Sequence, residues 1–194
     1  MKKITAIIMV MAIAIATVFA VTNPANNTLT LNYDVNDKVT LAYGFKMAGD
    51  STDTEKTTFD AGSSDGKIAE ATKTFSIIDH SYYNAASGYS LKIEIGDPTI
   101  WTNTVIASET GSDPSVSNLA AGTSTTTEDG VVLSVSGKSV TVAYPAVTTK
   151  AGIINRVSAD DGEIIATFTI TWADAEVAAG TYQSTATVTY TTVS

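Results

Sequence analysis

The fold is decided by Glu163-Ile-Ile-Ala-Thr-Phe-Thr-Ile-Thr-Trp172, followed after a short break by Thr181-Tyr-Gln-Ser-Thr-Ala-Thr-Val-Thr-Tyr190. Apolar and polar residues alternate through both segments. The alternation places Ile164, Ala166, Phe168, Ile170 and Trp172 on one face of the first, and Tyr182, Ala186, Val188 and Tyr190 on one face of the second. A period of two with many β-branched and aromatic residues is typical of half-buried strands. Such strands need a second layer over their apolar face, which favours a β-sandwich.

The same alternation recurs along the chain. It predicts strands over 28–35, 38–45, 72–78, 88–95 and 100–106, and a hairpin of 131–136 and 139–144 around Gly137. The Gly-, Ser- and Thr-rich stretches 46–71 and 107–130 are expected to be loops, and 173–179 is either a break or one helical turn. We therefore expect an all-β, Ig-like antiparallel β-sandwich of about eight to ten strands, in one domain over 21–194 after an N-terminal signal peptide helix.

The first 20 residues have the pattern of a secretory signal peptide. Lys2 and Lys3 precede an apolar run over 4–18, and Val18-Phe-Ala20 offers small residues at a cleavage site. An uncleaved membrane anchor is the alternative, although about 17 residues is near the short limit for a membrane span. We predict an exported protein, located in the periplasm, at the cell surface or outside the cell.

Charge and cysteine content exclude several function classes. The chain has no cysteine, so thiol catalysis, thiolate metal sites and a disulfide framework are excluded. It carries 11 Lys and Arg against 20 Asp and Glu, a formal charge of −9. Nucleic acids and anionic membrane surfaces bind basic faces, and no cluster of basic residues occurs here. The sequence predicts no nucleic-acid partner, and no membrane partner after cleavage of the signal peptide.

Residues able to do chemistry are few. His80 is the one histidine, it lies in the polar turn Asp79-His-Ser-Tyr-Tyr83, and no Gly-x-Ser-x-Gly nucleophile motif is present. We expect an exposed, structural His80. The carboxylates are dispersed, and the Asp-rich stretches 34–37 and 160–163 suit turns better than calcium loops, although calcium binding stays open. The sequence therefore predicts no catalytic residue, no metal ligand and no cofactor.

Three aromatic residues are candidates for stacking on a ligand. Trp101 lies near a predicted loop, and Tyr82 and Tyr83 lie in a polar turn, where exposed rings could stack on a glycan. The alternative is that these rings are half-buried strand residues, which is the commoner role of aromatic side chains. Trp172 shares a face with Phe168 and Ile170, so we expect it in the core.

Two regions resemble the alpha-class (colonisation-factor type) pilins of the chaperone–usher pathway. Ala178-Ala-Gly-Thr-Tyr-Gln-Ser-Thr-Ala-Thr-Val-Thr-Tyr190 is similar to the Ala-Gly-x-Tyr turn and last strand of those subunits. The alternating segment 28–35 follows closely on the predicted cleavage site, as their first strand does. The resemblance covers about a quarter of the chain, and 46–130 takes no part in it. Exported Ig-like surface proteins share the first pattern, but the terminal Trp-x-Leu motif of Gram-positive surface domains is missing.

The resemblance implies assembly by strand addition. Segment 28–35 would be a donor strand whose Leu29, Leu31, Tyr33 and Val35 fill pockets in a neighbouring subunit. Contacts of that head-to-tail kind build filaments. The alternative makes 28–35 the first strand of its own domain. We expect a non-enzymatic structural or adhesive envelope protein whose partner is itself or another envelope protein. A carbohydrate-binding module with a glycan partner is the second hypothesis, and a hydrolase is the third.

Overall fold

The computed structural model describes residues 29–48, 56–122, 130–157 and 162–194, so the predicted signal peptide lies outside the described residues. The chain divides into two compact units, Met1–Val35 and Asn36–Ser194. The sequence predicted one domain over residues 21–194, and that boundary stays a prediction. In the first unit, residues 29–35 form no strand.

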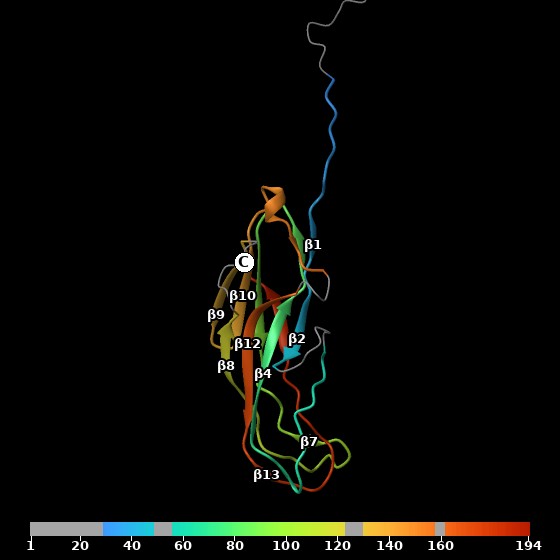
Figure 1. Cartoon of the computed structure of the whole chain (residues 1–194), viewed down its shortest axis with the longest axis vertical. Helices are drawn as coiled ribbons and strands as arrows, with labels where there is room; N and C mark the ends of the chain where they lie inside the picture. Colours follow the sequence, from blue (N-terminus) through green and yellow to red (C-terminus); the bar gives the residue numbers. More distant parts are fainter. Residues whose placement is uncertain (1–28, 49–55, 123–129, 158–161) are drawn as a thin grey trace, which may run out of the picture. The chain divides into compact units, whose positions relative to one another are not determined.

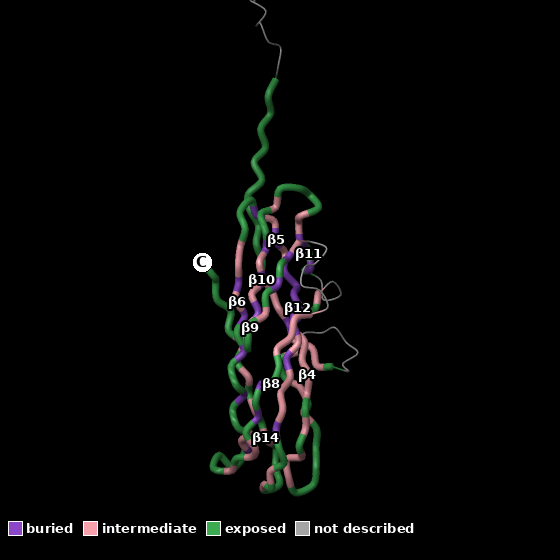
Figure 2. Tube along the Cα trace, turned by 90° about the vertical axis from the view of Figure 1, so that its left-hand side faces the viewer, coloured by how far each residue is buried: buried purple, intermediate pink, exposed green. Residues whose placement is uncertain are grey.

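The second unit is built on two four-stranded antiparallel sheets (Figure 1). One sheet has the order β2 (Tyr43–Met47), β4 (Ala71–Asp79), β12 (Glu163–Trp172) and β8 (Ser115–Ala121). The other has the order β15 (Val188–Thr192), β6 (Tyr89–Ile95), β10 (Ser139–Tyr144) and β9 (Val132–Ser136). Residues of both sheets form one apolar core, including Ile77, Ile93, Val140, Val142 and Phe168 (Figure 2). The predicted all-β, sandwich-like fold is confirmed.

Three smaller sheets complete the unit. They pair β1 (Lys38–Thr40) and β11 (Ile154–Asn155) with β5 (Tyr82–Asn84), β3 (Lys67–Ile68) with β13 (Ala175–Glu176), and β7 (Thr102–Asn103) with β14 (Tyr182–Gln183). One 3-10 turn, η1, spans Lys150–Gly152. The described part of the chain thus holds fifteen strands, more than the predicted eight to ten. Two predicted strands, 38–45 and 181–190, are each divided in two, and β3, β5, β8 and β13 form where loops or turns were expected. Within the same residues, no helix has the length and apolar character needed to span a membrane.

The strand that decides the fold carries a register shift. In β12, Phe168 pairs with Phe75 of β4 and its ring stacks on that residue at 5.3 Å, and Trp172 is buried as predicted. Between Ile164 and Ala166 the register shifts, as at a β-bulge, which places two residues of one strand opposite one of the other. As a result Ile165 is 0% exposed and Ile164 is 38% exposed. The prediction that Ile164 lies in the core was wrong.

Strand β8 was not predicted, because 107–130 was expected to be a loop. It pairs with β12 from Ser115 to Ala121, and Val116 is its one buried hydrophobic side chain. Its register shifts opposite Thr169 and Ile170, so its side chains do not follow a simple alternation. Main-chain pairing with β12 forms this strand, and pairing of that kind leaves little signal in a stretch of small residues.

The last predicted strand, 181–190, is divided into β14 and β15. The residues between β14 and β15 run along the segment that joins β6 to β7, with Gly96 N donating to Thr187 O at 2.8 Å and Thr99 N to Thr185 O at 3.1 Å. Pro98 lies between these bonds and has no N–H to donate, so the ladder is interrupted. Tyr182 therefore pairs with Asn103, whereas Val188 and Tyr190 pair with Ile95 and Ile93.

Candidate functional site

The candidate donor segment exposes a row of large apolar side chains. Leu29 is 82% exposed, Leu31 84%, Tyr33 90% and Val35 73%. Polar residues stand between them, so in an extended conformation the four apolar side chains would share one face. Single exposed apolar residues are common, but four within seven residues form a surface that is typical of a binding segment. The described part, 29–35, is thus able to add to a sheet edge as a strand.

Two sheet edges of the second unit meet at a tyrosine pair. β15 ends one four-stranded sheet and β2 ends the other. The rings of Tyr190 from β15 and Tyr43 from β2 stack with centroids 5.5 Å apart and planes inclined by 15°. Tyr190 is 42% exposed, and Thr189, Thr191 and Thr192 are exposed as well. An edge strand with this exposure is a place where another strand can pair.

A charged and hydrogen-bonded cluster lies inside the second unit. Asp79, at the end of β4, is fully buried, and its Oδ2 accepts hydrogen bonds from Tyr144 Oη and Arg156 Nη1, each at 2.8 Å. Its Oδ1 accepts from Ser81 N at 2.9 Å. Arg156 is also buried and forms a second ion pair, Nη2 to Glu163 Oε2, at 2.6 Å. We name Asp79, Arg156, Glu163, Tyr144 and Tyr43 the buried ionic cluster.

The cluster joins the two large sheets through tyrosine hydroxyls. Tyr43 Oη of β2 and Tyr144 Oη of β10 are 2.7 Å apart, and Tyr144 Oη also lies 3.2 Å from Ser81 Oγ. Burial raises the pKa of both hydroxyls above their usual range, and the nearby Asp79 carboxylate raises each further. Because the hydroxyls and charges are satisfied by one another, the cluster suits a structural role better than an acid–base one.

The two tyrosines are expected to make folding stability fall at alkaline pH. An unfolded tyrosine loses its proton near pH 10, while the folded Tyr43 and Tyr144 keep theirs, so above pH 10 the folded state binds more protons. Stability should be fully present below pH 10 and fall above it, by up to about 1.4 kcal/mol per pH unit for each group. Urea unfolding between pH 8 and 11 measures this. Tyr144→Phe should flatten the decline, and an equal decline in that variant would contradict the assignment.

The three predicted stacking residues lie in different surroundings. Tyr83 is fully buried, its ring stacks on Tyr144 at 5.1 Å and its hydroxyl donates to Ser87 O, so no ring face is left for a ligand. Tyr82 is partly exposed, with Lys38 Nζ 4.9 Å from its ring centroid. Trp101 is partly exposed and packs edge-on against Trp172 at 5.3 Å. Figures 1 and 2 show that β5, which holds Tyr82, and the β7–β14 pair beside Trp101 lie at opposite ends of the second unit.

His80 is buried, at 4% exposure, and the prediction of an exposed histidine was wrong. Its backbone N donates to Ala42 O at 2.8 Å, which extends the pairing of β2 with β4 beyond Asp79. Gly162 lies directly against the imidazole, because a Cβ built at that position would be 2.3 Å from His80 Cε1. The turn therefore packs inward against Gly162, just before β12, which the local polarity of the sequence did not indicate.

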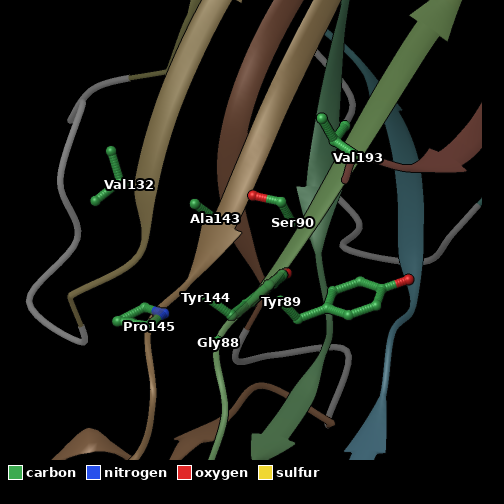
Figure 3. A pocket seen from close by; sticks show the side chains of 8 residues that line it. All are labelled: Gly88, Tyr89, Ser90, Val132, Ala143, Tyr144, Pro145 and Val193. Carbon is green, nitrogen blue, oxygen red and sulfur yellow. The ribbon is translucent and has the colours of Figure 1, made fainter.

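The described residues of the second unit line shallow depressions, including the following two. The first, of about 320 Å³, is on the outer face of the sheet of β15, β6, β10 and β9 (Figure 3). Its floor is Ser90 and Ala143, which are paired across β6 and β10, with Val132 and Val193 to the sides. The second, of about 340 Å³, is lined by Glu70, Asp113, Ser115, Thr171, Trp172 and Ala173. Among the described residues, no three His, Asp or Glu side chains gather into a group that could hold a metal ion.

Comparison of the chain with protein-family models, with curated proteins and with solved structures gave no match. The sequence pattern predicted the candidate donor segment, which stays a prediction, and gave no indication of the buried ionic cluster. The signal that could have found the cluster is Arg156, the single arginine of the chain, which directly follows Ile153-Ile-Asn155.

Proposed function

We propose that this protein is an exported structural or adhesive subunit that assembles with copies of itself by β-strand addition. Residues 29–35 of one copy are the donor strand, and the Ig-like sandwich of the next copy supplies the sheet edge. A contact between two different surfaces does not close on itself, so the product is a filament. The apolar run and cleavage pattern of residues 1–20 support export of the subunit to the cell envelope.

The exposure of Leu29, Leu31, Tyr33 and Val35 is the observation that carries the proposal. Burying one such side chain stabilises a complex by about 1.5–3 kcal/mol. Four of them, each buried in a pocket of the neighbouring subunit, would therefore supply most of the binding free energy of a stable contact. Main-chain hydrogen bonds to the acceptor edge add affinity, and the alternate side chains set the register. The site needs no metal or cofactor for this role.

Replacing Leu31 and Tyr33 with Ser is expected to abolish assembly of the mature protein. Each lost side chain should weaken the contact about 10- to 100-fold, because a factor of ten corresponds to about 1.4 kcal/mol. Sedimentation at increasing protein concentration measures the oligomers. The matched control replaces Thr30 and Asn32 with Ala, which changes the same segment on its other face and should leave assembly intact. A monomeric wild-type protein, or equal loss in both variants, would contradict the donor-strand function.

A further inference from the structure

Strand β15 forms one edge of its sheet and is short and largely exposed. It has five residues, it pairs with β6, and four of its residues, Thr189 to Thr192, are exposed. Its register places Val188, Tyr190 and Thr192 opposite Ile95, Ile93 and Leu91, which are core residues. These three side chains therefore lie on the same face of the sheet as those core residues, although Tyr190 and Thr192 are still partly open to solvent. The stack of Tyr190 on Tyr43 is the aromatic contact that β15 makes with the other large sheet.

The donor segment repeats the pattern of β15 with larger apolar side chains. If Tyr33 is set at the position of Tyr190, then Leu31 falls on Val188 and Val35 on Thr192. Leu29 then falls on Ala186. Every inward position receives a side chain that is at least as large and apolar as the resident one, and the direction of the strand is kept. A strand with this pattern would bury more apolar surface on β6 than β15 does.

One outward position of the same alignment is complementary in charge. Asp34 falls on Thr191, which pairs with Lys92 of β6. Lys92 is now ion-paired with Glu94 on the same strand. A carboxylate directly opposite a lysine across an antiparallel pair stabilises that pair, whereas the threonine of β15 offers no charge there.

We propose that residues 29–35 of a second copy replace β15 on the edge of β6 when subunits assemble. This inference rests on the proposed function and names its acceptor. In the free subunit β15 covers the β6 edge and limits assembly. In the assembled state Tyr33 of the second copy takes the place of Tyr190 against Tyr43, and Asp34 lies opposite Lys92.

The test locks β15 in place with a disulfide, Thr189→Cys with Glu94→Cys. Hydrogen-bonded pairs recur every second residue along an antiparallel ladder. Backbone bonds from Gly96 N to Thr187 O and from Val193 N to Ser90 O identify two such pairs of this ladder. Thr189 and Glu94 lie two residues from the first of them and therefore form another. The Cα atoms of such a pair lie about 5.5 Å apart, which suits a disulfide. The chain has no other cysteine, so the bond is unambiguous.

The oxidised variant is expected to assemble at least about ten-fold more slowly than the same protein after reduction. The reduced form also serves as the control for correct folding of the variant. A charge exchange supplies a second measurement: Asp34→Lys should slow assembly, and adding Lys92→Asp should restore it. If the oxidised variant assembles as fast as the reduced one, while deletion of 29–35 still abolishes assembly, strand replacement is overturned and the proposed function stands. If the wild-type protein does not assemble at all, the proposed function itself fails.

Discussion

Replacing Asp79 with Ala is expected to destabilise the second unit by about 3–5 kcal/mol, which is a large part of the stability of a domain of this size. The variant leaves the guanidinium of Arg156 buried with one ion pair where it had two, and it removes the acceptor of the Tyr144 hydroxyl. A buried charge that loses one of its two ion pairs retains its desolvation penalty, so the loss of stability exceeds that of an ordinary hydrogen bond. The midpoint of urea unfolding at pH 7 measures it.

Two further variants identify the cause. Asp79→Leu combined with Arg156→Met removes both charges and should recover part of the lost stability, because apolar replacements of a buried ion pair are often tolerated. Lys67→Met breaks the exposed pair with Asp174 and should change the midpoint only slightly. If Asp79→Ala were no more harmful than Lys67→Met, the cluster would not stabilise the fold.

Replacing Ile165 with Ala is expected to cost about 2–5 kcal/mol, whereas Ile164→Ala should cost less than about 1 kcal/mol. Ile165 is fully buried, so its truncation leaves a cavity in the core, while Ile164 lies on the outer side of the register shift. The two variants are matched in chemistry and differ by one position in β12. Unfolding in urea compares them directly.

A strict alternation along 163–172 requires the opposite order, because it places Ile164 with Phe168 in the core. If Ile164→Ala proved the more harmful change, the register shift between Ile164 and Ala166 would be wrong. The pair of substitutions therefore tests the pairing of β12 with β4 and not merely the presence of a strand.

The alternation of apolar and polar residues predicted strand positions best where the two faces of a strand lie in different surroundings. β4, β6 and the β9–β10 hairpin form close to the predicted segments, and Gly137 adopts the positive φ of 57° that its turn requires. Alternation failed for β8, a strand of small residues, and the polarity of the surrounding turn failed for His80. In both cases the deciding contact comes from a segment distant in sequence: β12 for β8, and Gly162 for His80.

The candidate site was predictable in part. The donor segment has a local signal, because its apolar residues are two apart and follow the predicted cleavage site. The buried ionic cluster has almost none, since Asp79, Tyr144 and Arg156 come from separate parts of the chain. The stacking candidates show the same limit, because burial of Tyr83 against Tyr144 depends on how the sheets pack.

The sequence by itself determined the all-β class and the absence of thiol chemistry, because side-chain period and composition are local properties of the chain. The tertiary structure alone decided that Ile165 is in the core in place of Ile164, that Asp79 meets Arg156, and that β14 and β15 are separate. Register, ion pairing and the interruption at Pro98 each depend on a partner strand, and the physical reason is that a hydrogen-bond ladder is a property of two segments together.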